Sequence, residues 1–459
     1  MELIYIFICF PYFVVRLIQI IVQISLIVMS NLGFKKGDKV VIIGGGFAGL
    51  QLAKTLMKSD LQVILVDKQN HHQFQPLFYQ VASGRLEPSS ISFPFRKIFQ
   101  SSKNVDFRMA DIVSINPVDK KLMTAYGRTV SYDHLVIATG CKTNYFGNEQ
   151  LSENALPMKT TQDSINIRNK ILFSFEKEIF AHTVDKQAWM NIVIVGAGPT
   201  GVELSGSFAE LKKDVLPKDY HNIDFSKFNI ILLEGSKYTL NNMSEESKIA
   251  SRKYLEQMGV IVKTETFLVS YDGNVAVLNT GETIPTKNVI WAAGVTGNVI
   301  EGLGADDIFR NRYVVDRFNK LKNFDNIYAL GDVAYMNTPK YPNGHPQVAN
   351  VAINQAKVLG KNILKSLKNE DAKLEEYEYN DLGMMATIGK HKAVVEFPFI
   401  KFKGPIAWYI WMFLHLMLIL SVRNKIVIFF NWAWSYLTKD TSLRLITTID
   451  YKKDKITDF

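Results

Sequence analysis

The sequence predicts an α/β fold in which one doubly wound strand–helix–strand unit occurs twice in a chain of 459 residues. Two observations support this prediction. In each copy an apolar strand leads into a glycine-rich turn that opens a helix, and a second apolar strand then ends at an acidic residue. The copies begin near Lys39 and near Ile192. They predict two domains of one kind rather than a short-period repeat array, and the length allows two or three domains of roughly 100 to 200 residues.

The first copy has a buried-strand run at residues 40–43, a helical pattern at residues 48–57, and a second strand at residues 63–66 before Asp67. Between the strand and the helix stands Gly44-Gly45-Gly46-Phe47-Ala48-Gly49, a G-x-G-x-x-G motif. Its first glycine makes a tight turn, its second lets backbone N–H groups approach a pyrophosphate, and its third lets helix and strand pack closely. The motif therefore predicts a dinucleotide site at the helix N-terminus.

The second copy has a strand at residues 192–195, a helix over residues 201–211, and a strand at residues 230–233 before Glu234. Its turn, Gly196-Ala197-Gly198-Pro199-Thr200-Gly201, repeats the motif. A carboxylate at this strand end accepts hydrogen bonds from both ribose hydroxyls and repels a 2′-phosphate, so the site should prefer NADH to NADPH. One such motif could be a plain glycine-rich turn, whereas two copies in register favour two dinucleotide sites.

Three further strand ends fit a flavoprotein. Residues 135–140 and 289–294 are apolar runs that end on small-residue turns. Near residues 328–332 a strand stops at a glycine followed by Asp332, which can meet the ribityl hydroxyl and pyrophosphate end of a flavin. Each string alone fits a plain strand-to-loop junction equally well. Their order along the chain favours the flavoprotein.

The composition excludes several function classes. The chain has 53 Lys+Arg against 44 Asp+Glu, a net charge of +9, which admits nucleic acid, anionic lipid or anionic cofactors as partners. We expect no nucleic acid, because no aromatic-basic stacking motif accompanies the charge. Cys9 and Cys141 are the only cysteines. They fit a reducing compartment and exclude a disulfide framework, a cysteine zinc site, an iron–sulfur cluster and a redox-active cysteine pair, so no metal site is expected.

The N-terminal segment admits two interpretations. Residues 3–29 form a nearly unbroken apolar run whose only charge is Arg16, and about 20 helical residues suffice to span a bilayer. Translation from Met29 is the equal alternative, in which the preceding residues are an artefact of start-site choice. A signal peptide is not expected, because no basic start or small-residue cleavage site is present.

The C-terminal segment predicts a membrane contact. Residues 406–422 are apolar apart from His415, and a second apolar run follows at residues 426–436, after the basic break Arg423-Asn424-Lys425. The tryptophan and tyrosine rings of this segment suit the headgroup level of a bilayer, and the basic break suits lipid phosphates. We expect two helices lying in one leaflet. A buried helix pair or a dimer contact is the alternative.

Several stretches together resemble the type II NADH dehydrogenases, single-chain NADH:quinone oxidoreductases among the two-domain flavoproteins of the glutathione-reductase type. They are residues 70–84, 198–204, 291–295 and 331–332 and the aromatic C-terminal segment. The resemblance covers about residues 38 to 447. It implies an FAD-binding domain at residues 38–165 and 301–385, an NADH-binding domain at 166–300 and a membrane-anchoring region at 386–459. The apolar N-terminal extension at residues 1–29 lies outside the resemblance.

The resemblance also implies the cofactor sites. Non-covalent FAD is expected on Gly44, Gly46, Gly49, Asp67 and Asp332. The substrate NADH is expected on Gly196, Gly198, Gly201 and Glu234. Further cofactor contacts are expected at Phe47, Thr139, Gly140, Gly331 and Gly294.

The same resemblance places Glu203 beside the flavin ring. We expect this carboxylate in the first turn of the second helix, where the helix dipole favours its ionised form, and expect it to order the nicotinamide and relay protons to the quinone. A plain helix N-terminal acid is the alternative. For the quinone, Asn350 stands where the family usually has Gln, and Gln347 is a second candidate. Lys390 could stabilise a developing quinol anion or be a solvated surface lysine.

The predicted function is a non-proton-pumping NADH:quinone oxidoreductase of the respiratory chain, which passes a hydride from NADH to FAD and then two electrons to a membrane quinone. We expect a peripheral, monotopic protein on the cytoplasmic face of the cell membrane, in contact with anionic lipid. A transmembrane N-terminus and a homodimer are left open. The alternatives are a ferredoxin or rubredoxin reductase, a sulfide:quinone oxidoreductase-like enzyme, and a flavin-containing scaffold without turnover. A disulfide reductase is excluded, because no cysteine pair follows the first helix.

Overall fold

A computed structural model describes residues 32–180, 186–440 and 443–447. The apolar run at residues 3–29 and the alternative start at Met29 lie outside the described residues. The chain forms two compact units. Among the described residues, unit 1 takes those within Met1–His72, Pro94–Cys141 and Thr296–Asn380, and unit 2 takes those within Gln73–Phe93, Lys142–Val295 and Asp381–Phe459.

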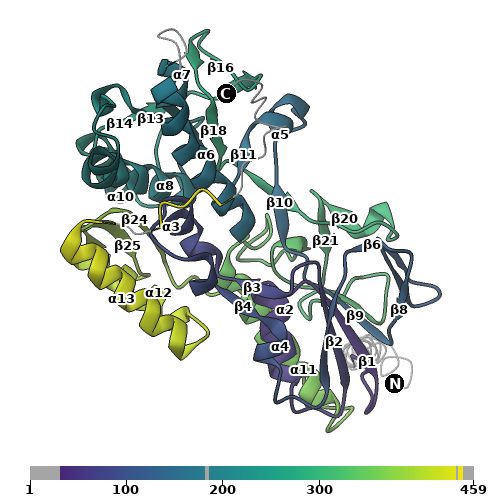
Figure 1. Cartoon of the computed structure of the whole chain (residues 1–459). Helices are drawn as coiled ribbons and strands as arrows, with labels where there is room; N and C mark the ends of the chain where they lie inside the picture. The colour runs from purple at the N-terminus through teal and green to yellow at the C-terminus, as the bar shows by residue number, and fades with distance from the viewer. Residues whose placement is uncertain (1–31, 181–185, 441–442, 448–459) are drawn as a thin grey trace, which may run out of the picture. The chain divides into compact units, whose positions relative to one another are not determined.

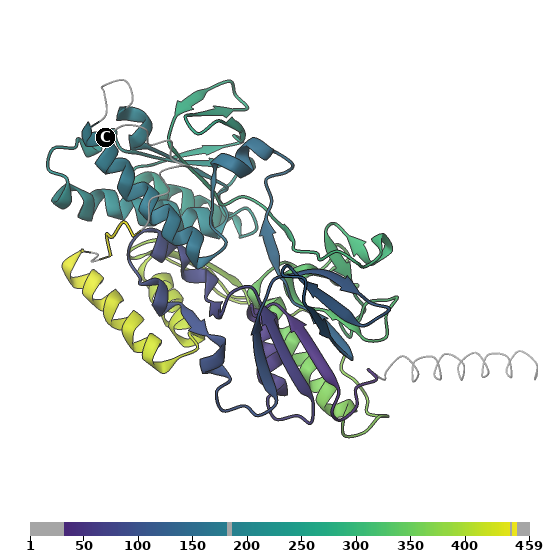
Figure 2. The ribbon, with the colours of Figure 1, turned by 45° about the vertical axis from the view of Figure 1, so that its right-hand side comes forward.

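Unit 1 is built on a five-stranded parallel sheet in the order β22-β9-β1-β2-β5. These strands are Ile327–Ala329, His134–Ile137, Lys39–Ile43, Gln62–Asp67 and Val105–Met109. Helices α2 (Phe47–Leu56) and α11 (Ala349–Ser366) pack together on one face, against alternate residues of β1 such as Val40 and Ile42 (Figures 1 and 2). Val41 and Ile43 face the opposite core, because successive side chains of a strand alternate in direction.

The second face of this sheet is covered by short strands. An antiparallel sheet of β6, β7 and β8 contributes buried Ile112, Ile115 and Leu122 to the same cluster as Val41 and Ile43. The three strands are Ile112–Asn116, Lys121–Thr124 and Thr129–Ser131, and the nearby strands of the same core are β20 (Ile308–Phe309), β21 (Arg312–Val314) and β23 (Ala334–Tyr335). The sheet is therefore buried on both faces, as expected for a parallel sheet.

Unit 2 repeats the arrangement with a five-stranded parallel sheet in the order β11-β18-β12-β13-β14. These strands are Leu156–Pro157, Asn288–Trp291, Asn191–Val195, Asn229–Glu234 and Val260–Thr264. Val193 and Val195 of β12 face a core that includes an antiparallel sheet of β15 (Leu268–Tyr271), β16 (Val275–Leu278) and β17 (Thr283–Pro285). Before residue 381, the described α-helices of the unit are α3 (Phe78–Ala82), α5 (Glu149–Asn154), α6 (Thr161–Phe180), α7 (Lys186–Met190), α8 (Pro199–Glu210), α9 (Leu216–Asp219) and α10 (Glu245–Gln257).

The predicted duplication of a doubly wound unit is confirmed, and each predicted strand is found within one residue of its bounds. The second helix begins at Pro199 rather than Gly201, because Gly198 in extended backbone provides its N-cap and a proline is tolerated in the first turn. The segment Gln73–Phe93, which the sequence prediction joined to the first domain, belongs to compact unit 2.

The C-terminal part of unit 2 forms an antiparallel sheet and two helices. The sheet consists of β24 (Met384–Gly389), β25 (Lys392–Glu396) and β26 (Lys401–Lys403), and the helices are α12 (Pro405–Leu418) and α13 (Val422–Thr438), drawn at the yellow end of the colour scale in Figure 1. After α13, Arg444 Nε lies 2.8 Å from Asp219 Oδ2, so the chain that follows the helix contacts an earlier segment of unit 2.

The two predicted C-terminal helices are present, but the predicted break at Arg423-Asn424-Lys425 is wrong. The break lies at residues 419–421, and the basic residues belong to the first turn of α13. The buried Asn424 amide donates hydrogen bonds to the carbonyl oxygens of Ser89 and Ser90, at 3.1 and 2.8 Å, which fixes this turn on unit 2. Over the described ranges, every helix is too short or too polar to cross a membrane.

Candidate functional site

The glycine-rich turn of unit 1 forms a cradle that only small residues permit. Gly44 has a left-handed φ of +98°, and a Cβ there would lie 2.3 Å from the carbonyl oxygen of Ala138. A Cβ on Gly49 would lie 1.8 Å from the carbonyl oxygen of Gly44, so this glycine allows the helix to approach the turn. Gly46, the N-cap of α2, instead faces open space within 4 Å. The turn therefore presents backbone N–H groups at a helix N-terminus, with room for an anion.

Asp67 lies beside this cradle at the end of β2. Its Oδ2 accepts a 2.6 Å hydrogen bond from the Gly45 N–H, and its Oδ1 accepts one of 2.7 Å from Gln69. Burial raises the pKa of Asp67, and the two backbone hydrogen bonds oppose this shift. A cavity of about 460 Å³ is lined by Gly44, Asp67 and Thr139 together. This arrangement fits the ribose and pyrophosphate of a dinucleotide.

The other predicted residues of unit 1 lie at the ends of strands and helices. Thr139 Oγ1 donates to the Asn298 carbonyl at 2.6 Å, and Gly140 and Gly331 have left-handed φ values of +67° and +72°. Phe47 opens α2 and meets the ring of His72 edge-on, with centroids 5.3 Å apart. The Gly331 N–H donates to Gln355 Oε1 at 2.7 Å, an interaction that the motif analysis did not predict.

The structure joins Asp332 to one of the two predicted quinone residues. Gln347 Nε2 donates to the Asp332 carbonyl oxygen at 2.9 Å, and the Cys141 thiol donates to Asp332 Oδ2 at 2.9 Å. Asn350 lies in the first turn of α11, where its Oδ1 accepts a 2.7 Å hydrogen bond from Asn354. Cys141 therefore contacts Asp332, the acid that is predicted to bind the flavin. The sequence analysis considered Cys141 only for a redox role, which it excluded.

Unit 2 contains a second cradle with the same geometry. Gly196 has a φ of +99°, and a Cβ there would lie 2.8 Å from the Cα of Ala293. A Cβ on Gly201 would lie 1.8 Å from the Gly196 carbonyl oxygen, whereas Gly198 faces open space. Glu234 at the end of β13 accepts hydrogen bonds from Ala197 N–H (2.7 Å) and Ser236 N–H (2.8 Å), as Asp67 does in unit 1. The duplication therefore extends to the hydrogen bonds of the acid.

Glu203 is buried in the second turn of α8, so the prediction of a first-turn, ionised carboxylate is wrong. Burial raises its pKa to about 8, and a 3.4 Å hydrogen bond from the Thr387 N–H opposes the shift. The missing side chain of Gly206 lets β24 pack closely against α8 at this point, since a Cβ there would lie 1.6 Å from the Ile388 carbonyl oxygen. The carboxyl group therefore holds a proton at neutral pH.

Lys390 lies at the turn between β24 and β25. Its Nζ donates to the Tyr436 carbonyl oxygen at 2.6 Å and lies 4.0 Å from the centroid of the Tyr436 ring. Its backbone N–H donates to Glu210, which also pairs with Arg85. Partial burial lowers the pKa of Lys390. The two contacts with Tyr436 therefore hold the ammonium group against α13.

Glu203 and Lys390, the two predicted catalytic residues, line one cavity of about 80 Å³ in unit 2. Its other walls include Tyr79, Gln80, Trp411 and Trp432. Glu203 and Tyr79 also line a second cavity, of about 120 Å³, together with Gly294 and Thr200 near the start of α8. Glu203 therefore lies between a cavity beside the second glycine cradle and an aromatic cavity beneath α12 and α13.

The aromatic cavity contains residues that the sequence analysis did not single out as a site. Tyr79 and Gln80 lie in the stretch 70–84 that carried the resemblance, and Trp432 was assigned only to the membrane segment. Trp432 Nε1 donates to Gln80 Oε1 at 2.7 Å. The stretch 70–84 was a local signal that could have identified Tyr79 and Gln80, whereas their pairing with Trp432 depends on tertiary structure. In the described ranges, no cluster of three His, Cys, Asp or Glu side chains could hold a metal ion.

Comparisons with known proteins agree with this geometry. The sequence model of the pyridine nucleotide-disulphide oxidoreductases matches residues 38–356, and that of the NDH2 C-terminal domain matches residues 382–439. The type II NADH:quinone oxidoreductase NdhA of Mycobacterium tuberculosis is 32% identical over 435 residues, with 89% of each chain covered. Ndh of the same organism is 31% identical over 417 residues, with 87% of this chain and 88% of the relative covered.

A solved structure shows the same fold. NDH2 from Plasmodium falciparum, in complex with NADH, has a TM-score of 0.81 at 19% sequence identity, with 90% of this chain and 100% of that chain covered.

Proposed function

As a member of the pyridine nucleotide-disulphide oxidoreductase family, and within it of the type II NADH:quinone oxidoreductases, this chain transfers electrons from NADH to a quinone, and we propose that it does so through a non-covalently bound FAD. The match to the NDH2 C-terminal domain over residues 382–439 favours a quinone as acceptor over the ferredoxin, rubredoxin and sulfide alternatives. A scaffold without turnover is not favoured by relatives that are named as enzymes.

We assign FAD to unit 1. The open space at Gly46, the positive end of α2 and the carboxylate of Asp67 fit the pyrophosphate and ribose of the cofactor. Gly44, Gly49, Thr139, Gly140 and Gly331 shape the cradle, Phe47 opens its helix, and Asp332 is the proposed contact of the ribityl end. When bound, FAD accepts a hydride from NADH and passes two electrons onward.

We assign NADH to the cradle of unit 2, on Gly196, Gly198, Gly201, Glu234 and Gly294. Glu234 has both carboxylate oxygens at the strand end where ribose hydroxyls bind, and its negative charge repels a 2′-phosphate. Replacing Glu234 by Gln should therefore narrow the preference for NADH over NADPH. Steady-state rates with both nucleotides measure this ratio, and an unchanged ratio would remove Glu234 from the ribose site.

The proposed proton donor is Glu203. Reduction of a quinone by NADH consumes one proton overall, since NADH, quinone and H⁺ give NAD⁺ and quinol. Glu203 retains a proton up to pH about 8 and lines cavities on two sides, so it can supply this proton. Lys390 supplies a positive charge to the same cavity and stabilises negative charge that develops on the quinone oxygen. Asn350 and Gln347 of unit 1 are the proposed amide contacts of the quinone.

We further propose that α12 and α13 hold the protein peripherally on the cytoplasmic face of the membrane. Large apolar side chains are exposed on both helices, among them Phe413, Phe430, Trp434 and Leu437. Arg423 and Lys425 in the first turn of α13 suit the phosphates of anionic lipid. A homodimer that formed through the same region would bury these side chains in its interface. Sedimentation with and without detergent distinguishes a dimer contact from a membrane contact.

The observation that carries the assignment is the pair of matching cradles, each with an acid hydrogen-bonded to its glycine turn. The decisive experiment mixes the purified yellow protein rapidly with NADH and then with a short-chain quinone. We expect fast bleaching of the flavin absorbance by NADH and fast recovery with quinone. A colourless protein after reconstitution, slow bleaching, or absence of recovery would overturn the proposal.

A further inference from the structure

We propose that Tyr79 is a further catalytic residue that donates a hydrogen bond to a carbonyl oxygen of the quinone, and that Gln80 and Trp432 are positioning residues that hold it in this role. The inference rests on the proposed function, because it names a contact of the quinone in the cavity that Glu203 and Lys390 also line. All five residues belong to unit 2.

The hydrogen bonds fix the direction in which the Tyr79 proton points. Trp432 Nε1 donates to Gln80 Oε1 at 2.7 Å, and Gln80 Nε2 donates to the Tyr79 hydroxyl oxygen at 2.8 Å. An indole N–H can only donate, so the amide oxygen of Gln80 must face Trp432 and its NH₂ group must face Tyr79. Tyr79 therefore acts as an acceptor toward Gln80, and its own O–H proton is directed elsewhere.

The Tyr79 hydroxyl proton has no acceptor among the described residues. The side chain is only 5% exposed, and it lines both cavities that contain Glu203. A buried donor that makes no hydrogen bond carries the full cost of its desolvation, and such donors are rare in folded proteins. The unused proton of Tyr79 therefore indicates a ligand with an acceptor oxygen.

A second buried donor in the same cavity lies beside the Glu203 carboxyl. The Trp411 side chain is 2% exposed, and its Nε1–H makes no hydrogen bond of normal geometry within the described part of the chain. It lies close enough to the Glu203 carboxyl to offset part of the rise in that group's pKa. The Trp411 and Tyr79 rings meet edge-on with centroids 6.3 Å apart. Two donors thus converge near the proposed proton source.

The walls of the cavity select the class of ligand. Trp408, Trp411, Trp432 and Tyr436 supply flat apolar surface, and Tyr79 supplies a donor rather than an acceptor. A quinone headgroup is a flat ring whose carbonyl oxygens only accept hydrogen bonds. A hydrogen bond from Tyr79 strengthens as negative charge develops on the carbonyl oxygen during reduction, so it should lower the barrier more than it tightens binding. No bond to the Tyr79 proton is broken in this role.

The test separates the two half-reactions in detergent micelles with a short-chain quinone. Tyr79→Phe should slow flavin reoxidation by quinone about tenfold, mainly in its limiting rate, and leave flavin reduction by NADH unchanged. Trp432→Phe should slow reoxidation roughly three- to fivefold, because Gln80 is then free to rotate. Tyr126→Phe is the matched control, because the Tyr126 side chain is 85% exposed and lines neither cavity.

The outcomes are distinguishable from a failure of the proposed function. If the wild-type flavin is bleached by NADH but not reoxidised by quinone, the proposed function fails. If the wild type turns over and Tyr79→Phe reoxidises at the wild-type rate, or if both half-reactions fall alike, this inference fails. Should Tyr79→Phe not retain FAD, Gln80→Met provides the same comparison, because it removes the donor to Tyr79. Unchanged reoxidation in Gln80→Met would equally overturn the inference.

Discussion

Trp432 Nε1 donates a 2.7 Å hydrogen bond to Gln80 Oε1, although the two residues are 352 positions apart in the sequence. The contact joins α13 to the segment that contains Tyr79, and Asn424 in the first turn of the same helix donates hydrogen bonds to the carbonyl oxygens of Ser89 and Ser90. The helix that carries the exposed apolar side chains is therefore also a wall of the cavity that contains Glu203. Removing α13 would disturb the site and the proposed membrane contact together.

The rate of quinone reduction should fall as the pH rises through about 8. Burial raises the pKa of Glu203 to about 8, so the group loses its transferable proton above that value. Flavin reoxidation by quinone, measured by rapid mixing from pH about 6 to about 10, should show this fall, whereas flavin reduction should not. Glu203→Gln should abolish the transition and slow reoxidation by about tenfold or more. A wild-type rate without a step near pH 8, or the same step in Glu203→Gln, would contradict the assigned role.

Glu203 should also make the folded protein less stable at alkaline pH. The folded state holds a proton that the unfolded state releases between the ordinary pKa of 4.5 and the raised value of about 8. Stability therefore falls across this window as the pH rises, and the penalty is absent below it. Glu203→Gln has no such proton, so it should match the wild type near pH 4.5 and exceed its free energy of unfolding by roughly 1–3 kcal/mol above pH 8.

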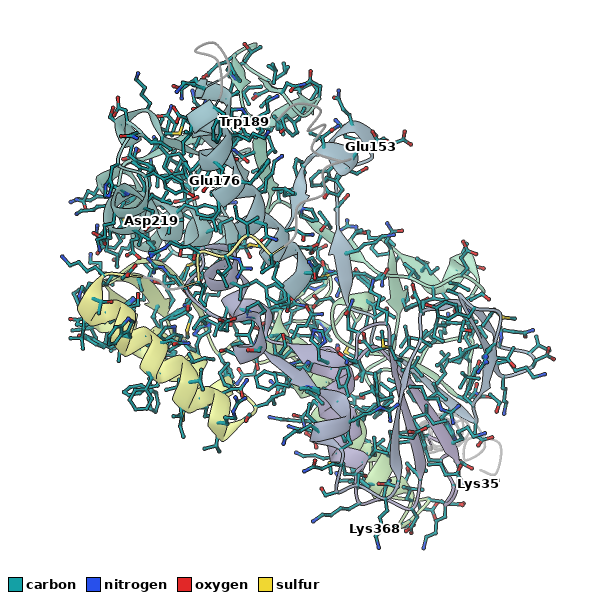
Figure 3. All side chains as sticks on the ribbon, viewed as in Figure 1. Lys35, Glu153, Glu176, Trp189, Asp219 and Lys368 are labelled. Carbon is teal, nitrogen blue, oxygen red and sulfur yellow. The ribbon has the colours of Figure 1, made fainter. Side chains whose placement is uncertain are left out.

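Urea unfolding at both ends of this window measures the difference. Glu153→Gln is the control, because Glu153 on α5 is an exposed glutamate of the same unit (Figure 3). A gain in Glu203→Gln that is equal at low and high pH, or one shared by the control, would show that burial of this carboxyl group is not the cause.

The two cradles could be predicted from sequence because their geometry is local. A strand, a turn with a left-handed first glycine and a helix N-terminus are all specified within about a dozen neighbouring residues, and the acid lies at the end of the adjacent strand. The structure accordingly has Gly44 and Gly196 at φ values of +98° and +99°. In each copy a backbone N–H of the turn also donates a hydrogen bond to the acid, from Gly45 to Asp67 and from Ala197 to Glu234.

The ionisation of Glu203 and the helix break at the C-terminus could not be predicted in this way, because distant contacts determine them. Burial in the folded protein raises the pKa of Glu203, and the contacts from Thr387 and Trp411, both far along the chain, only partly oppose this rise. The basic residues at the start of α13 are helical because Asn424 bonds to residues of the segment Gln73–Phe93. Charge pattern alone favoured a loop there.

Replacing the middle glycine of each glycine-rich motif by alanine should show which cradle binds FAD and which binds NADH. Gly46 and Gly198 each face open space, so a methyl group fits the protein alone but occupies the position where a pyrophosphate approaches. Gly46→Ala should weaken FAD binding by at least about tenfold, whereas Gly198→Ala should retain FAD and raise the KM for NADH about tenfold. Flavin absorbance and NADH titration provide the measurements, and each variant is the control for the other. Loss of FAD in Gly198→Ala would reverse the assignment of the cradles.

The exposed apolar face of α13 should determine membrane binding. Deleting the chain after residue 403 is a poor test, because Trp411 and Ile428 of the two helices are buried against the protein. We instead expect that Phe430→Ser with Leu437→Ser, at positions 65% and 78% exposed, lowers binding to vesicles containing anionic lipid by about tenfold or more. Phe180→Ser at the end of α6, where the ring is 80% exposed, is the matched control. Flotation of each variant with its FAD content and melting temperature checks the result, and binding that resists the double substitution would place the membrane contact elsewhere in the chain.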